Sequence, residues 1–403
     1  MIDYTPKHLV MVKAGANNNK YYNMIPKGDM WTAEYGRIGS GSQTRGYPKN
    51  QFESKYNEKI RKGYVDQTEY VKDLITENVS EDNKYLPIEN PEIANIVKRL
   101  QDMAHEAIEA NYTISASKVT QAMIDEAQSI ITNLLSVTDI EQFNQELIRL
   151  FTTIPRKMYT VNSHIAKSKD DFNKIISREQ DLLDVMAGQV VEKKTCFEKH
   201  ENDSPGKQTI LDSLGLIFEE CTIDDIATIK VALGSCSDRF YTAWRVKNIK
   251  TQNRFDSFIK DNNIKDVRLL FHGSRNENWW SIIQNGLVLR PTNAIINGKM
   301  FGYGIYYAPK ARKSLGYTSL SGSYWARGNS KSGFMALMKV AYGKPYNVYS
   351  FDSKYYHFNY NELQRNCAGA NCLHAHEGNM LRNDEIIVYK EEQCTIQYLV
   401  ELR

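Results

Sequence analysis

Met300-Phe301-Gly302-Tyr303-Gly304-Ile305-Tyr306-Tyr307-Ala308 places a turn directly before a strand in the last third of the chain. Two glycines precede alternating strand residues, which indicates a loop that leads into a short β-strand. Side chains alternate along a strand, so Tyr306 and Tyr307 point to opposite faces, one toward a site and the other toward the core. An aromatic pair with this spacing is more often ordinary packing, so the stretch by itself leaves both interpretations open.

Two other stretches combine a strand with a polar turn, namely Phe271-His272-Gly273-Ser274 and Asn383-Asp384-Glu385-Ile386-Ile387-Val388-Tyr389. His272 follows an apolar run, so its ring can lie at the end of a strand. Gly273 has no side chain, and its backbone can therefore approach a ligand closely. Glu385 precedes an apolar strand, where a carboxylate can lie at the rim of a site. Each stretch alone is also typical of an ordinary loop or a solvated strand end.

In this order and at these separations, the three stretches resemble the catalytic domain of the poly(ADP-ribose) polymerases. The resemblance covers about residues 207–403 and implies a split antiparallel β structure with NAD+ bound across its cleft as a substrate. In that family, glutamate at the position of Glu385 is the usual mark of chain elongation, and Met300 matches a position linked to elongation. Tyr303 departs from the pattern, because a lysine is common there, and this departure bears on the handling of acceptors and not on NAD+ binding.

The resemblance also implies roles for individual residues. The predicted catalytic residues are Glu385, His272 and Tyr306, and the predicted NAD+-binding residues are His272, Gly273, Ser274, Tyr306, Ser314 and Tyr317. His272 is expected to bind the adenosine ribose and Gly273 the carboxamide, with Tyr317 stacked on the nicotinamide. Cleavage of the nicotinamide ribosyl bond develops positive charge on the sugar, which the carboxylate of Glu385 is expected to stabilise.

The N-terminal part of the chain is basic and rich in strands. Residues 1–65 contain eight Lys and three Arg against two Asp and three Glu, a net charge of +6, although the whole chain carries only +3. Short apolar runs alternate with Gly, Asn and Lys turns, which predicts a small antiparallel sheet, and 52–62 has helical spacing. A polyanion such as DNA is one partner that this charge suits, and a solvated lysine-rich surface is the alternative.

Within this part, Trp31-Thr32-Ala33-Glu34-Tyr35-Gly36-Arg37-Ile38-Gly39 resembles the Trp-Gly-Arg (WGR) module of DNA-dependent members of the same family. The tryptophan of the module is replaced by Tyr35, which keeps an aromatic face. The resemblance implies that Tyr35 stacks on an exposed base or sugar at a DNA end. Arg37 is expected to contact phosphate or the next domain.

The middle of the chain is predicted to be helical. Asn90-Pro91-Glu92 combines a cap residue, a proline at the first helical position and an acid at the positive end of the helix. Apolar residues then repeat at helical spacing and predict five or six helices, which resemble the autoinhibitory domain of the family at 150–155 and 180–185. Polar segments at 82–91 and 192–207 are interpreted as linkers. The predicted fold is multidomain α+β, with domains at 1–82, 88–192 and 207–403.

Together these patterns predict a DNA-break-activated NAD+ ADP-ribosyltransferase that modifies protein acceptors, itself included, extends the chain and releases nicotinamide. A mono-ADP-ribosyltransferase and a catalytically dead scaffold that binds DNA ends remain as alternatives. DNA strand breaks are the expected partner, and the helical domain is expected to block NAD+ until a break is bound.

Other features set limits on the interpretation. No apolar run approaches the roughly 18 residues of a membrane span, the first residues are not a signal peptide, and the six cysteines are scattered, so an intracellular protein without a membrane partner is expected. The compartment would be the nucleus in a eukaryote and the cytoplasm in a bacterium or for a phage protein. Cys367, Cys372, His374 and His376 fit no common zinc spacing, so no metal is expected. Gly302 and Gly304 lack the third glycine and the helix of a dinucleotide-binding fold.

Overall fold

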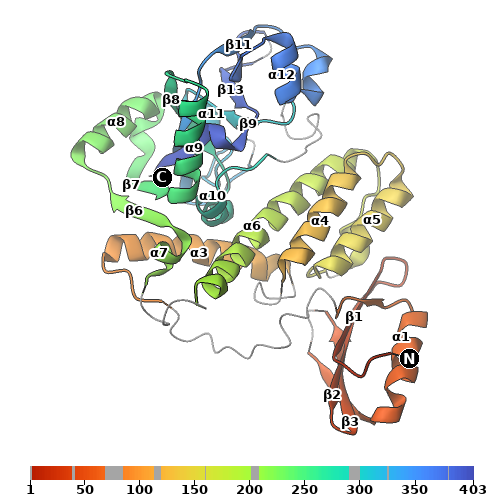
Figure 1. Cartoon of the computed structure of the whole chain (residues 1–403). Helices are drawn as coiled ribbons and strands as arrows, with labels where there is room; N and C mark the ends of the chain where they lie inside the picture. The colour runs from red at the N-terminus through yellow and green to blue at the C-terminus, as the bar shows by residue number, and fades with distance from the viewer. Residues whose placement is uncertain are drawn as a thin grey trace. The chain divides into compact units, whose positions relative to one another are not determined.

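The computed structural model describes residues 2–38, 41–68, 85–112, 119–158, 160–189, 208–289, 300–324, 326–379 and 381–403, together with the backbone of 190–200. Contacts within the chain group it into two compact units, and Figure 1 labels the elements of both. Unit 1 comprises Met1–Asp82 and Glu106–Val190, and unit 2 comprises Asn83–His105 and Val191–Arg403. The α+β class predicted from the sequence is confirmed. The division into three domains stays a prediction.

A small antiparallel sheet with one helix forms the first part of unit 1, as predicted. Its strands are β1 (Lys7–Lys13), β2 (Asn18–Lys27), β3 (Met30–Arg37), β4 (Gln43–Pro48) and β5 (Val65–Asp66), in the order β4-β3-β2-β1-β5. Helix α1 (Phe52–Arg61) buries Phe52 against Leu9, Trp31 and their apolar neighbours. Ile60, on the expected inner face of α1, is 37% exposed and does not join this core.

The described residues of the middle segment hold four α-helices, fewer than the five or six predicted. They are α3 (Pro91–Asn111), α4 (Gln121–Leu134), α5 (Ile140–Thr153) and α6 (Asp170–His200). Three begin at a predicted or recognisable cap, because the side chains of Asn90, Thr120 and Asp139 accept hydrogen bonds from backbone N–H groups of the first turn. The second predicted linker is partly wrong, since α6 continues to His200 through a run of strong helix formers that includes Glu192, Lys193 and Lys194.

Two sheets form the framework of unit 2. The larger is antiparallel, with the order β6-β7-β14-β10-β8, and comprises β6 (Leu216–Glu220), β7 (Phe240–Asn248), β14 (Cys394–Leu402), β10 (Gly333–Ala341) and β8 (Val267–Gly273). The smaller has the order β11-β12-β13-β9 and comprises β11 (Pro345–Val348), β12 (Cys372–Ala375), β13 (Glu385–Val388) and β9 (Ile305–Tyr307). Only the β11–β12 pairing in these sheets is parallel.

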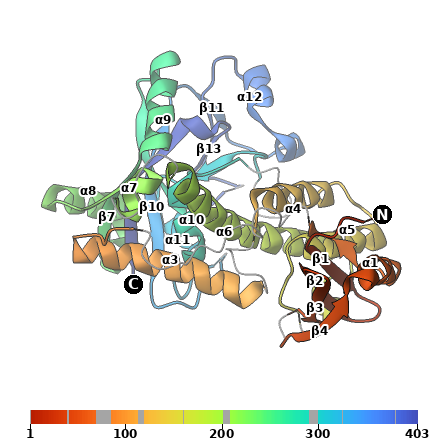
Figure 2. The same ribbon diagram turned by 60° about the horizontal axis from the view of Figure 1, so that its bottom comes forward.

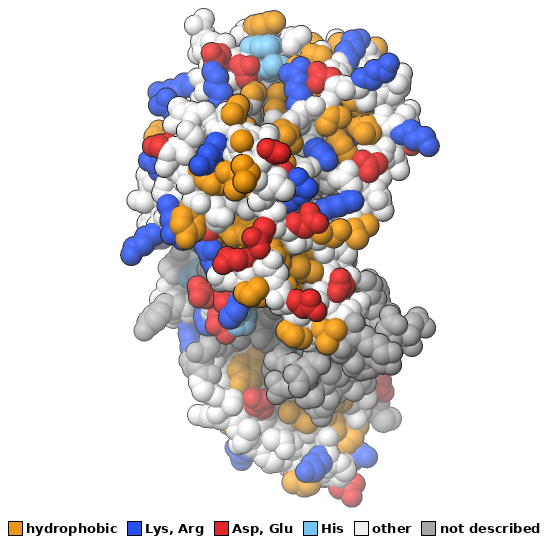
Figure 3. All heavy atoms as spheres, turned by 90° about the vertical axis from the view of Figure 1, so that its left-hand side faces the viewer, with side chains coloured by type: hydrophobic (Ala, Val, Ile, Leu, Met, Phe, Trp, Pro, Cys, Tyr) orange, Lys and Arg blue, Asp and Glu red, His pale blue; other side chains and the backbone are white. Residues whose placement is uncertain are grey.

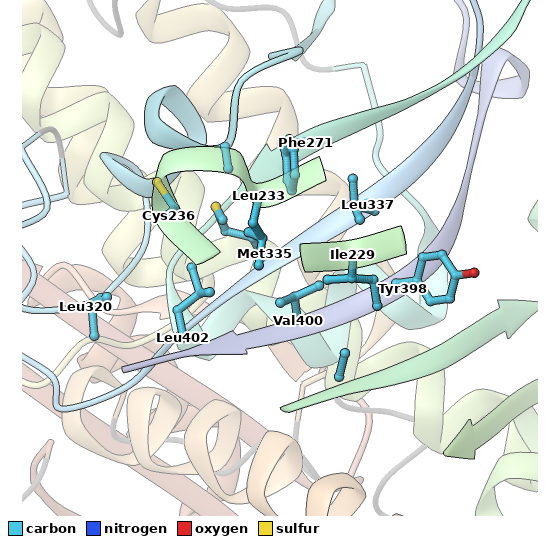
Figure 4. Close-up of a cluster of buried hydrophobic side chains, with 12 residues drawn as sticks. Ile229, Leu233, Cys236, Phe271, Leu320, Met335, Leu337, Tyr398, Val400 and Leu402 are labelled. Atoms are coloured by element: carbon cyan, nitrogen blue, oxygen red, sulfur yellow. The ribbon is translucent and has the colours of Figure 1, made fainter. Parts of the chain in front are cut away.

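Short helices cover these sheets. They are α7 (Ile210–Leu214), α8 (Ile223–Leu233), α9 (Ile249–Asp261), α10 (Trp279–Asn285), α11 (Ala311–Leu315) and α12 (Tyr360–Asn366). Six 3₁₀ turns complete the described structure, η1 (Lys49–Gln51), η3 (Val161–Ser163), η4 (Gly234–Arg239), η5 (Asn276–Asn278), η6 (Ser353–His357) and η7 (Glu391–Gln393). Figure 4 shows Ile229 and Leu233 of α8 in one buried cluster with Met335 and Val400 of the larger sheet.

The first turns of α3 pack on the larger sheet within unit 2, near β10 in the view of Figure 2. Ile93, Ile96 and Leu100 are buried on this face. Beside them, both terminal nitrogens of the Arg99 side chain donate to the carboxylate of Glu401 in β14, each at 2.9 Å. This ion pair links α3 to the central strand of the sheet, where Glu401 is fully buried.

The hydropathy of the helices and the charge of one face bear on possible partners. No helix among the residues described is both long and apolar enough to cross a membrane. On the face drawn in Figure 3, basic and acidic side chains are mixed and hydrophobic side chains are scattered among them. Charge therefore does not single out a binding region on that face.

Candidate active site

A pair of backbone hydrogen bonds joins the two sheets of unit 2 at the predicted site. Phe271 and Ala308 exchange N–H···O=C bonds of 2.9 and 3.0 Å, which places the end of β8 beside β9. His272 consequently lies next to Tyr306, and its Nδ1 is 3.0 Å from the Tyr306 carbonyl oxygen. A carbonyl can only accept, so Nδ1 carries the proton and Nε2 is the acceptor nitrogen of the neutral ring.

Gly273 is required for a reason that the sequence did not reveal. A Cβ atom at this position would lie 2.0 Å from the carbonyl oxygen of Ser314 in α11. The hydroxyl of Ser314 also donates to the carbonyl of Phe271 at 3.1 Å, so α11 is held closely against the end of β8. Ser274 begins the turn that follows, as predicted, and its hydroxyl accepts from Asn278 at 3.1 Å.

Tyr306 organises the loop that precedes its own strand. Its hydroxyl accepts from the N–H of Phe301 at 2.9 Å and donates to the carbonyl of Gly302 at 3.1 Å. A Cβ at Gly302 would lie 2.1 Å from the Phe358 carbonyl oxygen, and one at Gly304 would lie 2.1 Å from the Cγ2 of Ile387. Close packing at both positions, together with the left-handed φ of +71° at Gly302, therefore explains the two glycines.

Glu385 is the first residue of β13 and is 95% buried, with a relative exposure of only 5%. The register pairs Ile387 with Tyr306, and alternation along β13 places Glu385 on the same face as Ile387. One carboxylate oxygen pairs with the Lys313 ammonium of α11, and the other, Oε2, has no hydrogen-bond partner among the described residues. Burial raises the pKa of Glu385, and the positive charge of Lys313 opposes this shift.

The negative charge of Glu385 affects the pKa values of two tyrosines. Burial raises the pKa of Tyr317 to about 12, and the negative charge of Glu385 contributes to the shift. The pKa of Tyr306 is raised well above its usual value for the same two reasons, burial first. One site is therefore lined by Glu385 of β13, Tyr306 of β9 and Tyr317, which lies just beyond α11.

The arrangement can do specific chemistry. A histidine acceptor nitrogen, two aromatic rings and a buried carboxylate suit a nucleotide whose ribose becomes positively charged when a glycosidic bond breaks. Lys313 was not among the residues predicted for the site. The available signal was its position four residues before Tyr317, a spacing that places two side chains on one face of a helical turn.

The four residues considered as zinc ligands are not brought together as a set. Cys367 packs against the hydrophobic cluster behind the smaller sheet, on the side of Leu373 and Ala375. Cys372 and His374 alternate with these two residues along β12 and therefore lie on the opposite face.

The predicted DNA-contacting residues lie on β3 in unit 1. Tyr35 stacks on Tyr22 of the neighbouring strand, with ring centroids 5.5 Å apart. Arg37 donates to the carbonyl of Asn17 at 2.8 Å and to its side-chain oxygen at 3.3 Å. The same side-chain oxygen accepts from the N–H of Val161 at 3.0 Å. Arg37 therefore supports the β1–β2 turn, which contacts the helical part of unit 1.

Comparisons with known proteins agree with this geometry. Residues 228–403 match the family model of the poly(ADP-ribose) polymerase catalytic domain, and residues 6–71 match that of the WGR domain. The putative poly [ADP-ribose] polymerase-like 100L of Invertebrate iridescent virus 6 is 32% identical over 168 residues, which are 40% of this chain and 85% of the viral protein. Poly [ADP-ribose] polymerase 2-B of Oryza sativa subsp. japonica is 24% identical over 358 residues, 82% of this chain and 57% of the plant protein.

The split sheet, the site and these matches define an NAD+ ADP-ribosyltransferase. The chain belongs to the poly(ADP-ribose) polymerase family. NAD+ is accordingly its substrate and is not a redox carrier.

Proposed function

We propose that this chain is a DNA-break-activated poly(ADP-ribose) polymerase. It cleaves NAD+, transfers ADP-ribose to protein side chains, its own included, extends the product and releases nicotinamide. The observation that carries the proposal is the buried carboxylate of Glu385, which is paired with Lys313 through one oxygen only and faces two tyrosines.

NAD+ binds along the junction of the two sheets in this proposal. The nicotinamide ring stacks on Tyr317, with Tyr306 in the same pocket, and its carboxamide bonds the backbone of Gly273 and the hydroxyl of Ser314. His272 holds the adenosine ribose, because the hydrogen bond at Nδ1 orients the ring and makes Nε2 the nitrogen able to accept from a ribose hydroxyl. Ser274 and its partner Asn278 shape the turn beside this ribose.

Glu385 acts on the reacting sugar. Its Oε2 accepts a hydrogen bond from the ribose next to nicotinamide and stabilises the positive charge that develops as the glycosidic bond breaks. The same carboxylate polarises the incoming hydroxyl of the acceptor. When that hydroxyl belongs to a bound ADP-ribose unit, the product grows, which is why glutamate at this position supports elongation.

Activation by DNA is supported by three features of unit 1. The WGR match covers residues 6–71, residues 1–65 carry a net charge of +6, and Tyr35 and Arg37 lie on one strand of the sheet. Lysine and arginine contacts to phosphate supply affinity by releasing counterions. The contact of Asn17 with Val161 then links the sheet to the helical segment, so that DNA shifts the population of a blocking state.

The test measures nicotinamide release and product size from labelled NAD+, with and without nicked DNA. The variants are wild type, Glu385→Gln and Glu219→Gln, the last being a matched control because Glu219 is an exposed acid on β6. We expect wild type and Glu219→Gln to form a ladder of products only with DNA. We expect Glu385→Gln to lose about 10²–10³-fold in rate, the usual cost of removing a preorganised electrostatic group.

Each of the other possible outcomes would contradict one part of the proposal. A single product size in wild type identifies a mono-transferase. Turnover that does not depend on DNA removes the regulatory half and leaves the chemistry. No turnover under any condition identifies a scaffold that binds DNA ends.

A further inference from the structure

The turn between β12 and β13 gathers two histidines and an aspartate on one face of the smaller sheet. The antiparallel register pairs His374 with Ile386 and Ala375 with Glu385. Continued by one residue, it sets His376 opposite Asp384, and alternation puts His374 on the same face as His376. Glu385 points to the opposite face, so this cluster is separate from the catalytic one although it is only one residue away.

The hydrogen bond of His376 determines which of its nitrogens can bind a cation. Nε2 lies 2.9 Å from the side-chain oxygen of Asn347 in β11, and an amide oxygen only accepts. Nε2 therefore carries the proton of the neutral ring, and Nδ1 carries the lone pair. Nδ1 lies 3.9 Å from Oδ2 of Asp384. Two electron-rich atoms at this distance favour a cation between them.

His374 completes the set. It is 92% buried, with a relative exposure of 8%. Its Nε2 lies 3.0 Å from the same Asp384 oxygen, and its Nδ1 lies 2.8 Å from the hydroxyl of Tyr342. A carboxylate only accepts, so without a metal Nε2 donates to Asp384 and Nδ1 accepts from the Tyr342 hydroxyl. Because a hydroxyl accepts as well as donates, Tyr342 can also hold the tautomer protonated at Nδ1 when a metal replaces the proton on Nε2. A ligating histidine usually has such a partner on its second nitrogen.

We propose that His374 Nε2, His376 Nδ1 and Asp384 Oδ2 bind one divalent transition-metal ion, Zn²⁺ or an ion of similar preference. One ligand atom from each residue lies within 4.8 Å of the others. Two imidazoles and one carboxylate suit Zn²⁺, whereas Mg²⁺ and Ca²⁺ prefer sites made of oxygen alone. The two rings stack with centroids 3.9 Å apart and an interplanar angle of 24°.

The metal would tie the end of β12 to the start of β13. Asp384 contributes both a ligand oxygen and, through its other oxygen, a hydrogen bond of 2.7 Å from the N–H of Glu377. Tyr349 stacks on the outer face of His376 with centroids 4.5 Å apart and covers the site from that side. The ion stabilises the turn that carries Glu385 without entering the NAD+ cleft, so this inference does not depend on the proposed polymerase function.

The experiment uses the full chain, with any affinity tag removed and metal stripped by a chelator. Zn²⁺ is titrated in competition with a chromophoric chelator, and the unfolding temperature is measured with and without the ion. We expect one Zn²⁺ per chain and a higher unfolding temperature when it is bound, because a ligand that binds the folded state stabilises it. Co²⁺ in place of Zn²⁺ should give visible absorption typical of nitrogen and oxygen ligands without thiolate.

Four variants decide the assignment. His376→Ala and Asp384→Asn should each weaken binding at least tenfold, whereas His357→Ala, at an exposed histidine of unit 2, and Cys367→Ser should bind as wild type. Asp384→Asn keeps the size of the side chain, so it tests the ligand set even if His376→Ala does not fold. Near-ultraviolet circular dichroism reports whether each variant is folded. Absence of stoichiometric binding in wild type, wild-type affinity in Asp384→Asn, or loss of binding in Cys367→Ser would each overturn the proposal.

Discussion

Burial makes the charge of Glu385 unfavourable for folding, and the same burial suits that charge to the chemistry proposed above. Burial disfavours the carboxylate, and Lys313 restores part of the loss through one oxygen. An uncompensated oxygen in a dry site is a strong acceptor, because few other dipoles compete for it. The residue therefore supplies negative charge where the sugar of NAD+ needs it, in the arrangement proposed above.

The first prediction concerns the acidic limb of the pH–rate profile. The proposed chemistry needs ionised Glu385, so activity falls as the pH drops through its pKa, which lies above the ordinary 4.5. Lys313→Met removes the charge that lowers this pKa, and the acidic limb should move to higher pH. The profile of kcat/KM in constant ionic strength measures it, with Lys331→Met, an exposed lysine, as the control. An unchanged limb in Lys313→Met contradicts the pairing.

The second prediction concerns Gly273. A methyl group 2.0 Å from the Ser314 carbonyl oxygen must displace α11 or the end of β8. We expect Gly273→Ala to lower kcat/KM for NAD+ about 10²-fold, since displacing a site by roughly 1 Å costs that much, and to destabilise unit 2 by about 1–3 kcal/mol. Gly46→Ala is the matched control, because nothing lies within 4 Å of its added Cβ. Normal turnover in Gly273→Ala would show that the contact is not tight in solution.

At the scale of elements, one largely buried ion pair adds to the apolar packing that attaches α3 to the larger sheet. Glu401 of β14 is fully buried, while Arg99 keeps 34% of its side chain exposed and also lies over the ring of Phe334. Arg403 is a second cation at 3.6 Å from Glu401. The pair is therefore a connection between helix and sheet whose loss would leave a buried charge only partly compensated.

The third prediction follows from this geometry. Arg99→Met keeps the packing of the side-chain stem and removes its charge. The free energy of unfolding should therefore fall by up to about 3–5 kcal/mol. Arg403 makes this loss smaller, because it still compensates part of the charge of Glu401. The double change Arg99→Met with Glu401→Gln should cost less. Urea unfolding gives both values. Lys98→Met, which breaks an exposed pair with Asp102 on the same helix, should cost about 1 kcal/mol at most. Equal effects of Arg99→Met and Lys98→Met would argue against a buried role.

At the scale of the whole molecule, the proposed regulation needs a physical link between the N-terminal sheet and the helical segment. Asn17 provides one, because its side-chain oxygen accepts from both Arg37 and the N–H of Val161. Its backbone is left-handed, with φ of +46°, a conformation that asparagine and glycine tolerate best. Removing the side chain while keeping that conformation is therefore feasible.

The fourth prediction uses the tolerance of glycine for the left-handed backbone of Asn17. Asn17→Gly should keep the turn, leave DNA affinity within about threefold, and reduce the stimulation of NAD+ turnover by DNA about tenfold, which is a typical allosteric coupling. Turnover is measured over a titration with nicked DNA. Asn263→Gly, at a second left-handed asparagine with φ of +49° in unit 2, is the control. Full stimulation in Asn17→Gly would remove this contact from the proposed route.

Local chemistry explains which predictions from the sequence were confirmed. Helix starts such as Asn90-Pro91 and the alternation of Tyr306 with Tyr307 depend only on near neighbours, because caps and strand periodicity are properties of a few consecutive residues. The length of α6 was misjudged, since charged residues favour a helix as readily as they favour a linker.

By itself the sequence determined the α+β class and the small basic sheet, because both have local signatures. It pointed to the candidates His272, Tyr306 and Glu385 only through the order and spacing of three stretches that together resemble a known family. Tertiary structure alone decided which distant groups meet. It pairs Lys313 with Glu385, packs Ser314 on Gly273, and sets Asp384 between two histidines while leaving Cys367 on the other face of the sheet. These contacts depend on sheet register and on packing between elements, and no spacing along the chain encodes either one directly.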